Sequence, residues 1–147
     1  DIKRAIQLGI PEGKLYKQLQ SGMDIVVNGH MVRSSDVVGP CRPGRKIGIS
    51  GDTRPTEKLS KFFENCDLLI FESTYAEDLR HKAVENFHST AVEAAKLANK
   101  SGVRKLVLTH FSTRYRQSKQ LLEEAPLIHE NVDDAHDLKI IHLPYRQ

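Results

Sequence analysis

Three residues that can bind metal ions or move protons, Asp52, Glu72 and His110, each end or follow an apolar segment typical of a buried strand. The carboxyl ends of parallel strands meet at one edge of a sheet, so this pattern indicates a single shared site. Carboxylate and imidazole groups are ligands that zinc accepts in proteins. The sequence therefore predicts a metal site made of strand ends.

Each of these residues also has a simpler interpretation. Asp52 is either a helix-capping residue in a turn or a carboxylate that bridges metal ions. His110 is either a hydrogen-bonded polar residue at a strand end or a ligand. His88 lies in a Phe-His-Ser-Thr segment before a helix, and is either a loop residue or a general acid that protonates a leaving oxygen. In the second case Glu72 would orient the imidazole of His88.

The elements that must position these residues alternate along the chain, which favours an α/β layered fold with strands buried on both faces. We expect Thr53 to cap a helix at 55–65 and Gly102 to end a helix at 90–100. In the helix at 90–100 the buried positions should be Val92, Ala95, Leu97 and Ala98. The predicted strands are 46–50, 67–72, 104–109 and 138–143, and the predicted helices are 55–65, 90–100 and 117–130.

The N-terminal part has a different pattern. Two short helical segments, 1–9 and 14–20, precede a hairpin whose turn is Asn28-Gly29. A Pro- and Gly-rich linker follows at 39–44. Residues 1–50 hold eight Lys or Arg against four Asp or Glu, whereas the rest of the chain is nearly balanced. The basic residues are either scattered over a solvated surface or form a surface that binds a polyanion.

The composition sets further bounds. At 147 residues with 28% charged residues, the sequence predicts one folded domain or part of one, and no apolar run is long enough to span a bilayer. Cys41 and Cys66 have no metal-binding or redox spacing, and the absence of a signal peptide favours a reduced, cytoplasmic setting. The chain begins without Met inside an amphipathic segment, so we expect a truncated or processed N-terminus.

Four motifs carry a resemblance to a known family. They are Gly-Asp-Thr-Arg-Pro at 51–55, Phe-Glu-Ser-Thr-Tyr at 71–75, His-Ser-Thr at 88–90 and Leu-Thr-His-Phe-Ser-x-Arg-Tyr at 108–115. In this order they closely resemble ribonuclease Z, the tRNA 3′-processing endonuclease family of the metallo-β-lactamase superfamily. The resemblance implies that residues 44–147 are the C-terminal half of a four-layer αββα domain. Residues 1–43 would be a protruding basic arm that binds the substrate.

The resemblance also implies roles for individual residues. Asp52 would bridge two zinc ions and His110 would be a terminal zinc ligand. His88 would assist departure of the 3′ oxygen, with Glu72 supporting it. In the arm, phosphate groups of the tRNA would be contacted by Lys3, Arg4, Lys14 and Lys17.

The function implied is that of a zinc-dependent endoribonuclease, acting as a homodimer, that cleaves precursor tRNA and releases its 3′ trailer. The His-x-His-x-Asp-His motif of the family does not occur in these 147 residues. We therefore expect a C-terminal portion of a longer protein, inactive alone. Two alternatives stay open: a metallo-hydrolase acting on small phosphodiesters, and a non-catalytic lobe that binds RNA or a partner through its basic segment.

Overall fold

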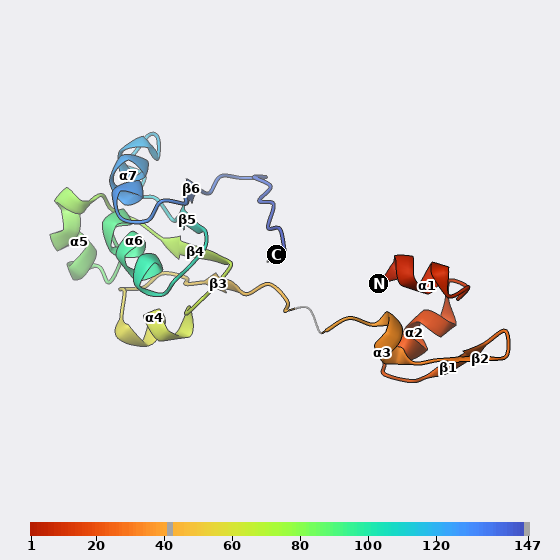
Figure 1. Cartoon of the computed structure of the whole chain (residues 1–147). Coiled ribbons are helices and arrows are strands. Elements are labelled where there is room, and N and C mark those ends of the chain that lie inside the picture. The colour runs from red at the N-terminus through yellow and green to blue at the C-terminus, as the bar shows by residue number, and fades with distance from the viewer. Residues whose placement is uncertain (41–42, 146–147) are drawn as a thin grey trace. The chain divides into compact units, whose positions relative to one another are not determined.

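The computed structural model describes residues 1–40 and 43–145. These form two compact units, Asp1–Pro43 and Gly44–Gln147. Figure 1 shows the elements of each unit. Of the two cysteines, Cys66 is a buried free thiol, and Cys41 lies outside the described residues.

The first unit consists of short helices and one hairpin around a small apolar core. Asn28 and Gly29 both have positive φ, at 52° and 78°, which is the requirement of the tight turn that Asn-Gly favours. The predicted hairpin is therefore confirmed, with Ile25 opposite Val32. The elements are α1 (Ile2–Gln7), α2 (Lys14–Gln20), β1 (Ile25–Val27), β2 (His30–Val32) and α3 (Ser34–Val37).

The second unit is built on a parallel sheet with the strand order β3-β4-β5-β6. Every neighbouring pair of strands in it is parallel, so all carboxyl ends lie along one edge. The α/β prediction is confirmed. The elements are β3 (Ile47–Ile49), α4 (Glu57–Phe62), β4 (Leu68–Glu72), η1 (Glu77–Leu79), α5 (Arg80–Glu85), α6 (Ala91–Lys100), β5 (Leu106–Thr109), α7 (Lys119–Glu124), η2 (Ala125–Leu127) and β6 (Val132–Asp134).

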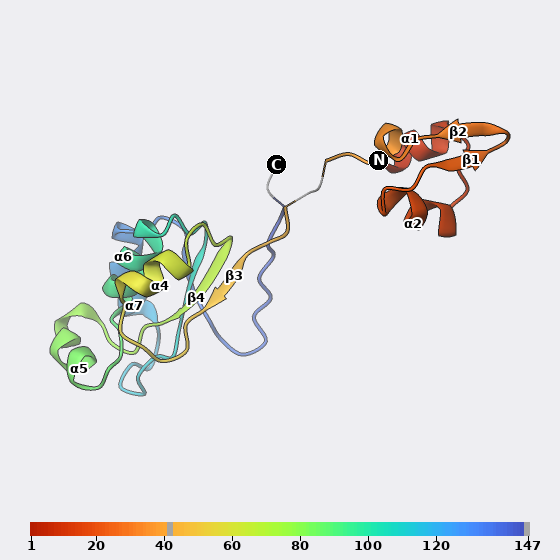
Figure 2. The same ribbon diagram turned by 90° about the horizontal axis from the view of Figure 1, so that it is seen from below.

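Helices α4, α6 and α7 lie on one side of the sheet (Figure 2). Because successive strand residues point to opposite faces, Leu69 and Phe71 of β4 pack into the core beneath these helices. At Gly48 of β3 a Cβ atom would lie 2.5 Å from the ring of Phe63, so the close approach of helix and strand requires glycine there. Ile47 and Ile49 point to the other face and are exposed. One helix layer on one sheet is half of a four-layer αββα arrangement.

The last strand is not where the sequence predicts it. Residues 138–143 form no strand, and Leu138 is 98% exposed with a φ of 64°. The outer strand is instead β6, where Val132 packs against the core and the chain pairs with β5. Its sequence, Val-Asp-Asp, lacks the alternation typical of a strand, and only Val132 contributes an apolar side chain to the core. Its carboxylates are held by lysines, such as Lys139, whose Nζ is 2.5 Å from Asp133 Oδ1.

Two smaller predictions are also wrong. The N-cap of α4 is Thr56, whose side chain accepts a hydrogen bond from the N–H of Leu59. Thr53 does not cap this helix. In α6, Ala95, Leu97 and Ala98 are buried as predicted, but Val92 is only partly buried. The predicted start and end of α6 are confirmed, with a capping box at Thr90 and Glu93 and with Gly102 in a left-handed conformation just after the helix.

None of the helices in the described part of the chain is both long enough and apolar enough to cross a membrane.

Candidate metal and acid–base site

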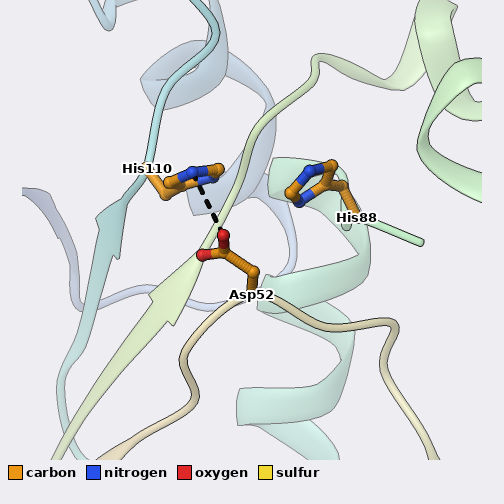
Figure 3. A group of neighbouring side chains, drawn as sticks. All are labelled: Asp52, His88 and His110. Atoms are coloured by element: carbon orange, nitrogen blue, oxygen red, sulfur yellow. Dashed lines mark ion pairs between the residues drawn. The ribbon is translucent and has the colours of Figure 1, made fainter. Parts of the chain in front are cut away.

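Asp52, His88 and His110 come together beyond the carboxyl ends of the strands, as Figure 3 shows. Asp52 lies in the loop after β3, and His110 follows β5 with a φ of 57°, which turns the chain sharply at the sheet edge. His88 comes from the loop between α5 and α6. Sequence segments 58 residues apart therefore share one site, because β3, β4 and β5 are adjacent and parallel.

The donor atoms of these three residues suit a metal ion. One ligand atom from each of Asp52, His88 and His110 lies within 4.8 Å of the others, the one such group among residues 1–40 and 43–145. His110 Nε2 is 3.4 Å from Asp52 Oδ2. Carboxylate oxygen and imidazole nitrogen are both donors that zinc accepts in proteins. Asp52 is 58% exposed and His110 45% exposed, so the group is accessible.

Glu72 lies directly beneath this group and is 1% exposed. Its carboxylate accepts hydrogen bonds from three backbone N–H groups, those of Thr53 (2.8 Å), Thr74 (3.2 Å) and Ser89 (3.0 Å). It also accepts from the Thr74 hydroxyl at 2.8 Å and binds His88 Nδ1 at 2.9 Å. The four hydrogen bonds from Thr53, Thr74 and Ser89 match the roughly four lone-pair positions of an ionised carboxylate. Glu72 therefore links the loops after β3 and β4 to the loop that carries His88.

The ring of His88 is fixed on two sides. Its Nδ1 binds Glu72 Oε1, and its ring stacks on that of His110 with centroids 5.1 Å apart and an interplanar angle of 26°. Tyr75 meets the His88 ring edge to face at 6.3 Å. Because Nδ1 is engaged with Glu72, Nε2 is the nitrogen through which His88 can exchange a proton with a substrate.

A second buried carboxylate, Glu93 of α6, holds the backbone of the His88 loop through Arg54. Arg54 forms an ion pair with Glu93 and donates a hydrogen bond from Nη1 to the carbonyl oxygen of His88 at 2.5 Å. Arg80 also contacts Glu93, at 3.3 Å. Burial by itself would raise the pKa of Glu93, but the hydrogen bond from Arg54, the capping hydrogen bond from Thr90 and the arginine charge outweigh it and lower the pKa below 4.5.

This shift predicts a stability loss in acid. Because the pKa of Glu93 is lowered in the folded state, its ion pairs stabilise the fold above pH 4.5, and this contribution is lost as the pH falls through the lowered pKa. We expect Glu93→Gln to lower the free energy of unfolding at pH 7 by roughly 1–3 kcal/mol and to flatten its decline below pH 4.5. Urea unfolding of the 147-residue chain between pH 7 and pH 3.5 measures both.

The matched control is Glu85→Gln in α5, whose side chain is exposed. It should change the free energy of unfolding by less than about 0.5 kcal/mol at each pH. An unchanged acid limb in Glu93→Gln would contradict the role of the Arg54–Glu93 pair.

The predicted phosphate-binding residues of the first unit are all exposed. Lys3 and Arg4 lie on α1, and Lys14 and Lys17 lie on α2. The guanidinium group of Arg4 makes one long hydrogen bond, to Gln7 at 3.5 Å. These four cations are thus presented to solvent, as binding of a polyanion requires, but their role stays a prediction.

Sequence reasoning on single residues missed three positions that build the site. Arg54 holds the His88 loop, Thr74 contacts both Glu72 and His110, and Ser89 donates its backbone N–H to Glu72 and its hydroxyl to the carbonyl of Thr53 at 2.5 Å. Each of the three lies within two residues of a predicted site residue, namely Asp52, Glu72 or His88. Their motifs gave a signal, but only the fold shows what each side chain contacts.

The parallel sheet, with acidic and histidine side chains at its carboxyl edge, is the architecture of an α/β metallo-hydrolase. A family model described as a beta-lactamase superfamily domain matches residues 31–111, which include all of Asp52, Glu72, His88 and His110. The chain belongs to this superfamily.

Individual relatives carry a more specific name. The chain is 50% identical to the ribonuclease Z of Nitrosopumilus maritimus over 138 residues. The aligned segment covers 94% of this chain and 46% of that protein. It is 43% identical to the ribonuclease Z of Methanosarcina acetivorans, over 98% of this chain and 48% of the relative. Among solved structures, the short form of human tRNase Z is 34% identical, with a TM-score of 0.55, over 78% of this chain and 37% of that one. The resemblance to ribonuclease Z is confirmed, and the chain spans about half the length of the curated relatives it matches.

Proposed function

We propose that this chain is part of a zinc-dependent endoribonuclease that cleaves precursor tRNA and releases the 3′ trailer. The observation that carries the proposal is the convergence of Asp52, His88 and His110 within 4.8 Å over the buried carboxylate of Glu72. Proteins named ribonuclease Z are 40–50% identical to this chain over most of its length, which supports RNA as the substrate.

In this proposal Asp52 and His110 hold the metal. Zinc, when bound, would lower the pKa of a coordinated water and neutralise charge on the scissile phosphate. The accessible edge of the sheet leaves room for a phosphodiester, since Asp52 and His110 are both about half exposed. Asp52 and His110 supply two donors, so further zinc ligands would be needed, and the relatives' additional length could supply them.

His88 would donate a proton to the departing 3′ oxygen. Its Nδ1 is engaged with Glu72 Oε1, so the proton would leave from Nε2. The imidazolium form, which carries a hydrogen on both ring nitrogens, is the form that can act as an acid. Stacking on His110 places this proton donor beside the proposed metal ligand.

The activity is tested in a chimera, because the chain spans about half of its relatives. The matching half of the Nitrosopumilus maritimus ribonuclease Z is replaced by this chain, and cleavage of a precursor tRNA with a 3′ trailer is followed on a gel. We expect a cut at the 3′ side of the tRNA that is lost on zinc chelation and regained when zinc is added. A chimera that holds zinc and folds, yet cleaves only small phosphodiesters, would overturn the proposal.

The exposed cations of the first unit predict a strong salt dependence of tRNA binding. Each tRNA phosphate that the protein no longer neutralises should reduce the slope of log affinity against log salt by about one. We expect a clearly smaller slope for the 147-residue chain with Gln at Lys3, Arg4, Lys14 and Lys17. Fluorescence anisotropy with labelled tRNA, at several salt concentrations, measures the slope.

A control with the same change in net charge separates a binding surface from general attraction. It replaces four exposed lysines of the second unit with Gln: Lys58, Lys61, Lys96 and Lys119. An equal reduction of the slope in the two variants would mean that the first unit holds no dedicated tRNA-binding surface.

A further inference from the structure

The hydroxyl group of Thr74 lies between the Glu72 carboxylate and the His110 ring. Its Oγ1 is 2.8 Å from Glu72 Oε2 and 2.8 Å from His110 Nδ1. Thr74 is buried, and its backbone is fixed at both polar atoms: its N–H donates to Glu72 Oε2, and its carbonyl accepts from the N–H of Ser112 at 3.1 Å. The hydroxyl therefore has a fixed position and two partners.

The direction of these two hydrogen bonds follows from the proton count. A hydroxyl group carries one hydrogen and can donate it to only one partner. The ionised carboxylate of Glu72 has no hydrogen to offer, so Thr74 donates to Glu72 and offers a lone pair to His110. His110 Nδ1 must then carry the hydrogen and donate it to Thr74 Oγ1.

In the neutral ring this leaves His110 Nε2 unprotonated, 3.4 Å from Asp52 Oδ2. Two acceptor atoms at this distance repel each other unless a cation lies between them. We propose that Thr74 is a positioning residue that holds His110 in the Nδ1–H tautomer and so presents Nε2, together with Asp52, as a metal ligand. This inference rests on the metal site of the proposed function.

One buried carboxylate would thus set the state of both imidazoles. Glu72 binds His88 Nδ1 directly through Oε1, and it acts on His110 Nδ1 through the Thr74 hydroxyl bound to Oε2. The two rings stack with centroids 5.1 Å apart, and each has its Nδ1 engaged and its Nε2 available. Partners of this kind, behind a metal-binding histidine, fix the orientation of the ring and raise its affinity for the metal.

The tautomer can be read without any metal. Long-range proton–nitrogen NMR spectra of the ¹⁵N-histidine-labelled, zinc-free 147-residue chain, recorded above the titration range of histidine, identify which ring nitrogen carries the hydrogen. We expect the Nδ1–H form of His110 in the wild type and in Thr74→Ser. In Thr74→Val, which keeps the shape but lacks the hydroxyl, we expect the Nε2–H form to become the major one. The Nδ1–H form persisting in a folded Thr74→Val would overturn the proposal.

Zinc titration of the chimera with the same substitutions gives the second readout. Thr74→Val should bind zinc about 10- to 100-fold more weakly than the wild type, with affinity restored in Thr74→Ser. Ser73→Ala removes a neighbouring hydroxyl, which bonds instead to the carbonyl of Thr109, and should leave the affinity unchanged. A tautomer that depends on Thr74 in a folded chimera that binds no zinc would uphold the hydrogen-bond role of Thr74 and reject the metal site, so the two claims fail separately.

Discussion

Replacing Asp52 by alanine is expected to lower precursor tRNA cleavage by the chimera about 1,000-fold or more. Its carboxylate is the one acidic donor in the group with His88 and His110, so its loss removes the negative charge that holds the metal. Metal catalysis contributes several kcal/mol of transition-state stabilisation, and each 1.36 kcal/mol is a factor of about ten in rate. Single-turnover cleavage rates and the zinc content of the purified variant measure the effect.

The control for this experiment is Asp78→Ala, in which an exposed carboxylate of η1 is removed. Its cleavage rate and zinc content should equal those of the unmodified chimera. A rate within tenfold of normal in Asp52→Ala would remove Asp52 from the metal site. Full zinc occupancy with no cleavage would instead assign Asp52 a role in catalysis without a role in holding the metal.

Glu72→Ala is expected to cost the second unit about 3–5 kcal/mol of folding free energy. The substitution leaves the backbone N–H groups of Thr74 and Ser89 without their acceptor in a buried position, and it breaks the contact with His88. Since small domains are stable by only about 5–15 kcal/mol, the variant should be near the limit of folding. Urea unfolding of the 147-residue chain, followed by circular dichroism, measures the loss.

Glu72→Gln gives a graded version of the same test. It keeps the size of the side chain but places an amide NH₂ group against donors that need an acceptor, so we expect a loss of roughly 1–3 kcal/mol. Glu85→Ala, at an exposed position of α5, should cost less than about 0.5 kcal/mol. A loss of under 1 kcal/mol in Glu72→Ala would show that Glu72 does not organise the loops around the site.

Local sequence patterns predicted most elements of the fold because each rests on nearby residues. Asn28-Gly29 is sufficient for the hairpin turn, and Thr90, Glu93 and Gly102 define the ends of α6. The patterns failed where partners distant in sequence decide. Val132–Asp134 is a strand because β5 offers it hydrogen bonds, whereas 138–143 has a better strand pattern but no such partner in the described part of the chain.

The candidate site shows the same division. Asp52, Glu72 and His110 could be named from the sequence because each ends or follows an apolar segment, and His88 because of its motif. Their convergence could be expected only from the rule that parallel strands end at one edge. The contacts of Thr74 and Arg54 could not be predicted, since each joins residues up to 39 positions apart through side-chain geometry.

The sequence by itself determined the types of chemical group, their order and the strands that carry them, because these depend on residue identity and short-range periodicity. The tertiary structure decided which groups share a site and which hydrogen-bond partners each of them has. A buried carboxylate must satisfy its hydrogen bonds with whatever donors the fold brings to it. For Glu72 these come from the loops after β3 and β4 and from the loop before α6, so their arrangement exists only once the sheet has formed.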